Sequence, residues 1–335
     1  MRVPATSANL GPGFDALGLA LALYDEVEAE VTAAGLTIEV SGEGADTAGA
    51  GERHLVVRAM RAAFGLSGGQ PPGLAVRCVN TIPQGRGLGS SAGAVVAGLL
   101  AARALAGHAG SAPAPSAPVA ASAGLAPGVG WPGPLALATE LEGHPDNAAA
   151  CLSGGLTIAW TSTGPGGGPR AVRLEPLPEI RPVLCVPAVS LATTAARQAL
   201  PETIPHRDAA ASAGRSALLI AALTKHPDML FDATEDLLHE PYRKPLMPGS
   251  AGLIARLRAA GVAAVLSGAG PSVLAFTVAG RDPGPGKVGS IARQTGNWQV
   301  TPLEIDRQGA TMLSVPPGTD PLTGERREAA RSRRG

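Results

Sequence analysis

The stretch that decides the fold of this chain reads Ile82-Pro83-Gln84-Gly85-Arg86-Gly87-Leu88-Gly89-Ser90-Ser91-Ala92-Gly93-Ala94. Three glycines stand at alternate positions, two serines follow, and an apolar run with helical spacing and no proline continues from there. This pattern predicts a glycine loop that opens a helix. Glycines let the backbone approach a ligand closely, and the free N–H groups and the dipole of a helix start attract anions. The stretch therefore predicts a site for an anion, with polyphosphate as the favoured ligand.

Two familiar phosphate loops do not fit this stretch. It lacks the Gly-Lys-Ser/Thr ending of a Walker A loop, and its glycines do not have the spacing of a Rossmann fingerprint. The remaining alternative is a glycine-rich turn that only caps a helix. For the glycine pattern alone the odds of that alternative are about even, and the serine pair lowers them.

The overall composition fits a protein with sizeable hydrophobic cores. A chain of 335 residues, 45% of them hydrophobic, can form one large domain or two ordinary ones, and we favour two. Basic and acidic residues balance at 27 each, so no charge excess indicates nucleic acid or an anionic membrane as a partner. The sequence has no apolar run of bilayer length, and Asn9 and Asp15 stand where a signal peptide would be apolar. We therefore expect a cytoplasmic protein. The three cysteines are scattered among apolar residues, which is typical of reduced core thiols.

Hydrophobic spacing predicts strands and helices separated by glycine- and proline-rich turns. Residues 3–15 have the composition of a loop, and residues 240–243 that of a turn. Strands are expected at residues 19–31, 36–40, 74–79, 156–160, 183–186, 262–266, 273–276 and 298–305. Besides the helix after the glycine loop, helices are expected at residues 54–64, 134–141, 193–200, 207–223, 230–238, 249–260 and 287–296.

Three stretches are poor in residues that form a core. Residues 109–133 are an Ala/Pro/Ser/Gly tract that predicts a flexible surface insertion. Residues 163–169 form a Gly/Pro linker, and we place the domain boundary close to it. From residue 319 on, the tail is polar and arginine-rich, which predicts disorder.

A second polar segment, Glu140-Leu141-Glu142-Gly143-His144-Pro145-Asp146-Asn147, follows the insertion. Carboxylates near a phosphate loop suit Mg²⁺, which favours oxygen ligands and shares them with a nucleotide. The alternative makes Asp146 a helix cap and the glutamates a solvated helix face. Taken by itself, the segment supports both interpretations equally.

Several motifs together resemble the GHMP kinase superfamily, which comprises galactokinases, homoserine kinases, mevalonate kinases and phosphomevalonate kinases. Residues 83–92 follow the second motif of that superfamily, Pro-x-x-x-Gly-Leu-Gly-Ser-Ser-Ala. Residues 4–15 are similar to the first motif in its homoserine-kinase form, and residues 268–272 to the third. Residues 142–147 and 193–201 also resemble homoserine kinases. The resemblance extends over residues 3–315.

The resemblance implies an α+β fold of two domains. The first, at residues 1–165, would be a nucleotide domain like ribosomal protein S5 domain 2, carrying the glycine–serine loop and the insertion. The second, at residues 170–316, would be a ferredoxin-like α/β sandwich. The family also implies a possible homodimer.

The resemblance also implies a role for individual residues. The ATP phosphates would contact Pro83, Gly85, Arg86, Gly87, Leu88, Gly89, Ser90, Ser91 and Ala92. The Mg²⁺ shell would be completed by Ser91, with Ser90 as the alternative, and by Glu142. The homoserine site would be lined by Asn9, Asp15, His144, Asn147, Thr193, Arg197, Arg243, Gly268 and Gly270. Catalytic roles would fall to Ser91, Glu142 and Arg197.

The implied reaction is transfer of the γ-phosphoryl group of ATP to L-homoserine, giving O-phospho-L-homoserine for threonine biosynthesis. A substrate carboxylate suits Arg197 and Arg243, and a substrate ammonium suits Asp15 with Asn9. Mevalonate-type relatives use a lysine–aspartate pair, but the chain has only three lysines and none lies near a motif. The resemblance to homoserine kinases therefore implies in-line transfer without a dedicated base. The alternatives are another small-molecule kinase of the superfamily, or an inert homologue that senses a ligand.

One departure concerns the nucleotide base. Relatives often carry Asn before the apolar pair in the adenine-side helix, whereas this chain has His54 there. The resemblance therefore leaves the adenine contacts at that position open.

Overall fold

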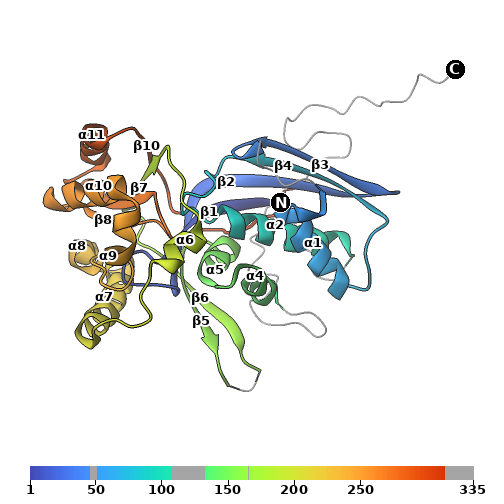
Figure 1. Ribbon diagram of the computed structural model, residues 1–335, viewed down its shortest axis with the longest axis horizontal. Coiled ribbons are helices and arrows are strands. Elements are labelled where there is room, and N and C mark those ends of the chain that lie inside the picture. The colour runs from blue at the N-terminus through green and yellow to red at the C-terminus, as the bar shows by residue number, and fades with distance from the viewer. Residues whose placement is uncertain (46–50, 108–132, 165, 314–335) are drawn as a thin grey trace.

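The computed structural model describes residues 1–45, 51–107, 133–164 and 166–313. Two β-sheets lie side by side along the long axis of the molecule, each with its own helices (Figure 1). The predicted insertion, apart from Gly133, and the predicted tail lie outside the described residues. Within the described residues, no helix is both long and apolar enough to cross a membrane.

The first sheet has six strands. They are β1 (Arg2–Ala8), β2 (Leu17–Thr32), β3 (Gly35–Gly42), β4 (Gly73–Asn80), β5 (Leu156–Ser162) and β6 (Gly168–Leu174). The order is β3-β4-β2-β5-β6, and β1 pairs with β2 outside this path. Strands β3 and β4 are parallel, and the other pairs are antiparallel. Strand β6 begins within the predicted linker and still belongs to this sheet, so the chain changes sheets between residues 174 and 180.

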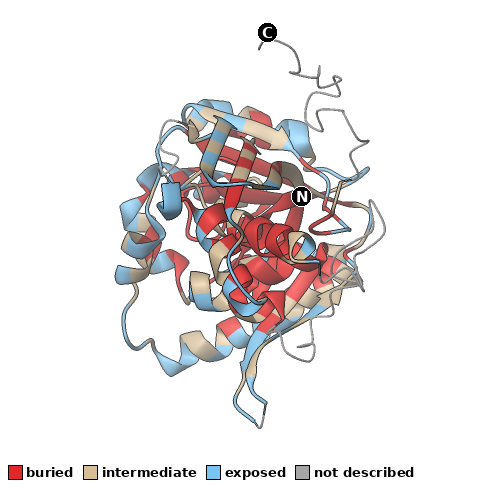
Figure 2. Ribbon diagram, turned by 90° about the vertical axis from the view of Figure 1, so that its right-hand side faces the viewer, coloured by how far each residue is buried: buried red, intermediate tan, exposed pale blue. Residues whose placement is uncertain are grey.

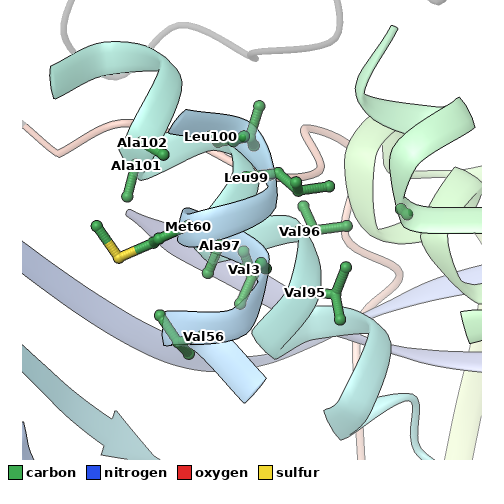
Figure 3. Close-up of a cluster of buried hydrophobic side chains, with 14 of the residues drawn as sticks. Val3, Val56, Met60, Val95, Val96, Ala97, Leu99, Leu100, Ala101 and Ala102 are labelled. Carbon is green, nitrogen blue, oxygen red and sulfur yellow. The ribbon is translucent and has the colours of Figure 1, made fainter. Parts of the chain in front are cut away.

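Helices cover this sheet and enclose its main core. They are α1 (Leu55–Leu66), α2 (Ser90–Leu105), α4 (Pro134–Glu142) and α5 (Asp146–Ser153), with a 3-10 turn, η2, at Gly51–Arg53. Helix α2 consists mainly of Ala, Val, Leu and Gly, so it can be buried over much of its surface. Figure 3 shows Val56 and Met60 of α1 gathered with α2 side chains around Val3. Burying each such Val or Met side chain contributes roughly 1.5–3 kcal/mol, which fixes the helix that the glycine loop opens.

The second sheet has four antiparallel strands in the order β10-β7-β9-β8. They are β7 (Ile180–Pro187), β8 (Ala263–Leu266), β9 (Val273–Val278) and β10 (Trp298–Pro302). Its α-helices are α6 (Thr193–Gln198), α7 (His206–Thr224), α8 (Leu230–Ala233), α9 (Glu240–Arg243), α10 (Pro248–Ala259) and α11 (Pro285–Thr295). Two 3-10 turns, η4 (Pro227–Met229) and η5 (Lys244–Leu246), lie between them.

Alternate side chains of strand β7 enter two different cores and so connect the two halves of the molecule. Val183 and Cys185 point into a core with α10 and α11, whereas Leu184 and Val186 belong to a core shared with the first sheet. Figure 2 shows the buried residues in red, concentrated in the strands and the helices packed on them. After β10 the chain returns to the first sheet, where Thr311 forms an isolated bridge with Arg2. The interface between the halves is therefore part of the hydrophobic core.

Most expected elements are confirmed, and three predictions are wrong. Residues 3–8 of the predicted loop belong to β1, because Val3 and Ala5 enter the two cores while the strand pairs with β2. The predicted helix at 230–238 ends at Ala233. The Asp236 carboxylate accepts the N–H groups of residues 238, 239 and 240 and so starts a separate short helix, α9, where a turn was predicted. The three cysteines are buried and free, as predicted.

Candidate active site

The glycine loop is clamped between the two halves of the molecule. Gly89, with φ 66°, precedes the first turn of α2, and a Cβ there would lie 1.9 Å from the Thr6 hydroxyl oxygen. A Cβ on Gly87 would lie 2.0 Å from the Ser267 carbonyl oxygen. Only glycine fits at these two positions, where the loop packs closely against Thr6 and Ser267. This close packing fixes the loop and the first turn of α2. The first N–H groups of a helix have no acceptor within it, so this turn can bind an anion.

A cavity of about 370 Å³ lies beside this loop, between the two halves. It brings together most of the predicted site residues: Asn9, Asp15, Gly85, Gly87, Leu88, Gly89, Ser90, Ser91, Ala92, Glu142, His144, Asn147, Thr193, Arg197, Arg243 and Gly268. Leu141, Asp146, Thr194 and Ala269 also line it, although we had not assigned them to the site. Pro83, Arg86 and Gly270 are not among its lining residues.

Arg86 connects the glycine loop in the first half to the end of β7 in the second half. Its guanidinium donates to the carbonyl oxygens of Pro187 (3.0 Å), Ala188 (2.8 Å) and Gln84 (2.9 Å). With Pro83 it lines a separate cavity of about 220 Å³ near the end of β7. The Gly270 N–H donates to the Ser267 carbonyl within the third-motif loop. The predicted phosphate contacts of Pro83 and Arg86 and the substrate contact of Gly270 stay predictions.

Two side-chain oxygens that could bind a metal ion meet at the glycine loop. Ser91, in the first turn of α2, donates its hydroxyl to the Glu142 carboxylate at the end of α4, with 2.6 Å between the oxygens. A hydroxyl and a carboxylate beside a phosphate-binding turn are ligands that Mg²⁺ favours. Within the described residues, no group of three or more His, Cys, Asp or Glu side chains could hold a metal ion. Ser91 and Glu142 together offer two oxygens to an ion, which would take its other ligands from a bound molecule or water.

A polar cluster borders these oxygens. The His144 imidazole donates from Nδ1 to the Asp146 carboxylate at 2.7 Å, and Asp146 is only 2% exposed. This hydrogen bond raises the pKa of His144. The Thr6 hydroxyl donates to the Asn147 side-chain oxygen at 2.7 Å, which orients that amide. Thr6 is a contributor that the sequence did not indicate, because its partner lies 141 residues away.

The first motif and α6 meet in an ion pair across the cavity. Arg197 donates two hydrogen bonds to Asp15, at 2.7 and 3.1 Å, and both side chains remain more than a third exposed. The pairing raises the pKa of Arg197. Asn9 accepts the Asp15 N–H (2.9 Å) and donates to the Gly268 carbonyl (2.8 Å), so its amide joins the first motif to the third.

Arg243 lines the same cavity, but unlike Arg197 its side chain is buried. It is 1% exposed, and it donates to Ala196 O (3.2 Å), His239 Nδ1 (3.1 Å) and Gly268 O (3.3 Å), all of them neutral acceptors. Among the described residues no carboxylate lies within ion-pair distance of Arg243. Burial, and then repulsion from Arg197, lower its pKa. A buried cation without a counterion is costly, and this one borders a cavity that an anion can enter.

A second cavity, of about 330 Å³, borders the glycine loop and shares Gly85, Ser90 and Ser91 with the first. His54 lines it, is 8% exposed, and has an Nδ1 atom without a hydrogen-bond partner. Burial lowers the pKa of His54, which favours the neutral ring. Asp25, which we had not predicted as a site residue, lies there too. The cavity thus offers an apolar wall with polar groups available to a ligand.

A glycine–serine loop at a helix start, beside a cavity between two α+β halves, fits the class of GHMP kinases, and the family models agree. The family models "GHMP kinases N terminal domain" and "GHMP kinases C terminal" match residues 54–127 and 215–294. The homoserine kinase of Streptomyces avermitilis is 50% identical over 321 residues, covering 94% of this chain and 95% of the relative. That of Clavibacter michiganensis is 45% identical, covering 96% of each. The chain belongs to the homoserine kinase family, as the motifs predicted.

Solved structures agree with this assignment. The crystal structure of homoserine kinase from Cytophaga hutchinsonii matches with a TM-score of 0.76 and 26% identity, over 92% of this chain and 95% of that one. A mevalonate kinase from L. major, in complex with R-mevalonate, matches with a TM-score of 0.61 and 13% identity, over 92% and 96%. The second match concerns the fold alone.

Proposed function

We propose that this chain transfers the γ-phosphoryl group of ATP to the side-chain hydroxyl of L-homoserine, giving O-phospho-L-homoserine for threonine biosynthesis. The observation that carries the proposal is a single cavity bordered on one side by the phosphate-binding turn and on the other by Arg243. A kinase for an amino acid needs both a phosphate site and a cation for the acceptor's carboxylate. The names of the relatives support the same substrate.

The two cavities around the glycine loop suit the two ends of ATP. Because the loop and the start of α2 border both, a triphosphate bound along them would have its base in the second cavity and its γ-phosphoryl group in the first. The N–H groups at the start of α2 would bind the phosphates. His54 Nδ1 is available to the base.

Ser91 and Glu142 are the residues that would hold Mg²⁺. When bound, the ion supplies neutralisation of charge on the transferring phosphates. In its absence, the hydrogen bond between the two side chains keeps both oxygens together at the start of α2.

The acceptor would bind across the opposite wall. Its carboxylate would take the donors of Arg243, whose cation has no acidic partner. Its ammonium would lie against Asp15, which its pair with Arg197 holds in position. This assignment uses fewer residues than the one from the sequence, which gave both arginines to the carboxylate and Asp15 with Asn9 to the ammonium.

Catalysis would come from positioning and charge neutralisation. The bond from the γ-phosphorus to the bridging oxygen of ADP breaks, a bond to the homoserine oxygen forms, and the hydroxyl proton leaves to phosphate or solvent. No lysine lines the described part of the cavity, and Lys244 pairs with Glu240. The donors of the loop and Arg197 would stabilise the developing charge without a dedicated base.

An acceptor panel tests this proposal. Purified protein with Mg²⁺ and ATP is assayed for ADP release in the presence of L-homoserine, mevalonate or galactose. We expect release that depends on L-homoserine and a product that is O-phospho-L-homoserine. Preference for another alcohol would favour a different kinase of the superfamily, and no acceptor-dependent release would favour an inert homologue.

A further inference from the structure

His239 is fully buried and links the first motif to Arg243. Its Nε2 lies 2.9 Å from the Gly11 carbonyl oxygen, and its Nδ1 lies 3.1 Å from Arg243 Nη1. A carbonyl oxygen can only accept, so Nε2 carries the ring proton. A guanidinium can only donate, so Nδ1 carries a lone pair. The two partners together fix a single neutral tautomer.

We propose that His239 is a positioning residue, whose neutral imidazole directs the Arg243 guanidinium toward the carboxylate of the acceptor. This rests on the proposed function for the identity of the acceptor. Of the three acceptors of Arg243, the imidazole Nδ1 is the nearest at 3.1 Å, and the Gly268 carbonyl is the most distant at 3.3 Å. Without His239, the Nη1 end would keep only the contact with Gly268.

The acceptor on Arg243 is neutral, and this preserves its charge for a ligand. A carboxylate at this place would orient the guanidinium equally well but would neutralise it and compete with the acceptor's carboxylate. Of the acidic residues on either side of His239, Asp236 lies with Oδ2 3.5 Å from the ring Nε2, and neither is within ion-pair distance of Arg243. Asp236 accepts the N–H groups of residues 238, 239 and 240, and Glu240 accepts the Leu266 N–H and pairs with Lys244.

The Phe14 ring restricts the same pair from one side. Its centroid lies 5.3 Å from that of the His239 ring and 5.2 Å from the Arg243 guanidinium carbon. Burial lowers the pKa of His239, which is consistent with the neutral ring that the two hydrogen bonds require. Ring, guanidinium and first motif therefore form one assembly beneath the acceptor wall of the cavity.

Two amide substitutions separate the two ring nitrogens. In His239→Asn the side-chain oxygen reaches about the Nδ1 position and can accept from Arg243, whereas in His239→Gln the amide nitrogen reaches about the Nε2 position and can donate to Gly11. We expect His239→Gln to raise KM for L-homoserine about tenfold to a hundredfold, with KM for ATP unchanged. His239→Asn should restore most of this loss, although it also removes one hydrogen bond.

Thr277→Val is the matched control for losing a buried hydrogen bond. Thr277 is 2% exposed on β9 and donates to the Arg181 carbonyl, and it lines neither of the two cavities beside the glycine loop. This variant should lower Tm without changing either KM. If His239 is only structural, both amide variants will behave like Thr277→Val, and the inference is overturned.

A spectroscopic measurement tests the inference independently of turnover. In ¹⁵N NMR of the imidazoles at neutral pH, we expect His239 to show a protonated Nε2 and an unprotonated Nδ1. A doubly protonated ring, or a proton on Nδ1, would overturn the inference even in an active enzyme. If the wild-type protein shows this tautomer but no turnover of L-homoserine, the proposed function fails and the Arg243 contact stands.

Discussion

Two arginines reach the same cavity from α6 and α9, and the structure holds them in opposite ways. Arg197 forms two hydrogen bonds with Asp15 while both groups remain in contact with water. Arg243 is 1% exposed and bonds only to neutral acceptors. Pairing and hydration weaken the attraction of a cation for a ligand's carboxylate in the bound ground state, whereas a buried unpaired cation has already lost its water. We therefore expect Arg243 to dominate recognition of the acceptor's carboxylate.

The largest effect is expected from Arg243→Met. Truncating one partner of a buried, hydrogen-bonded charge pair costs about 2–5 kcal/mol, so kcat/KM for L-homoserine should fall about 10²- to 10³-fold. Because the variant removes an unpaired buried cation, Tm should stay the same or rise. Steady-state kinetics and thermal unfolding check the two parts. A large drop in Tm with unchanged kinetics would make Arg243 a structural residue.

Ser91→Ala and Glu142→Ala test the side of the cavity that is proposed to bind Mg·ATP. Loss of one oxygen ligand or preorganised donor costs a few kcal/mol of transition-state stabilisation, so turnover of Mg·ATP should fall by orders of magnitude. Binding of L-homoserine, measured by calorimetry, should change little, in contrast to Arg243→Met. Wild-type turnover of either variant at saturating Mg²⁺ would exclude these ligands.

Arg197→Lys should have a smaller effect than Arg243→Met. Lysine keeps a charge for Asp15 but loses the planar fork that makes two hydrogen bonds. We expect KM for L-homoserine to rise about three- to tenfold, with a smaller change in KM for ATP. An effect as large as that of Arg243→Met would contradict the ranking of the two arginines, and unchanged constants would make Arg197 a surface charge.

Asp25, in the lining of the second cavity, extends the comparison to a buried carboxylate, and here the property measured is stability. Burial raises its pKa to about 6, although Oδ1 accepts the N–H groups of Thr81 and Ile82. A carboxyl whose pKa is raised in the folded state stabilises the fold below its ordinary pKa of about 4. That contribution is lost as the pH rises through about 6.

Asp25→Asn keeps an oxygen for both N–H groups and removes the buried charge. The variant should therefore be more stable than the wild type by about 1–3 kcal/mol above pH 7, with the difference vanishing near pH 4. Denaturant unfolding at both pH values measures it. A variant that is less stable at pH 8 would show that the ionised carboxylate is needed.

The glycine loop was predictable because its signal is local. Its spacing predicted the helix start, and the family motifs named most of the side chains that line the cavity. Strand β1 was not predictable in this way, because Thr6 and Ser7 look like loop residues. They tolerate burial because Thr6 bonds to Asn147, and Ser7 to Ser267.

Pairing over long sequence distance accounts for the other differences. Asp15 and Arg197 are 182 residues apart, and nothing local indicates that they bond to each other before any ligand arrives. Arg86 was assigned to phosphate because of its motif position, and that assignment stays a prediction, whereas its bonds to the carbonyl oxygens of residues 187 and 188 emerge only in the folded chain. The spacing of four residues between His239 and Arg243 was a usable signal, which the interpretation of 240–243 as a turn concealed.

The central claim is that Arg243 binds the acceptor's carboxylate, and removing each partner in turn tests it most directly. The measurement is kcat/KM for L-homoserine and for 2-aminobutane-1,4-diol, which lacks the carboxylate, with the wild type and with Arg243→Met. We predict that the wild type loses about 10²-fold or more on the diol, whereas Arg243→Met treats both acceptors nearly alike. A variant that still discriminates against the diol as strongly as the wild type would contradict the account.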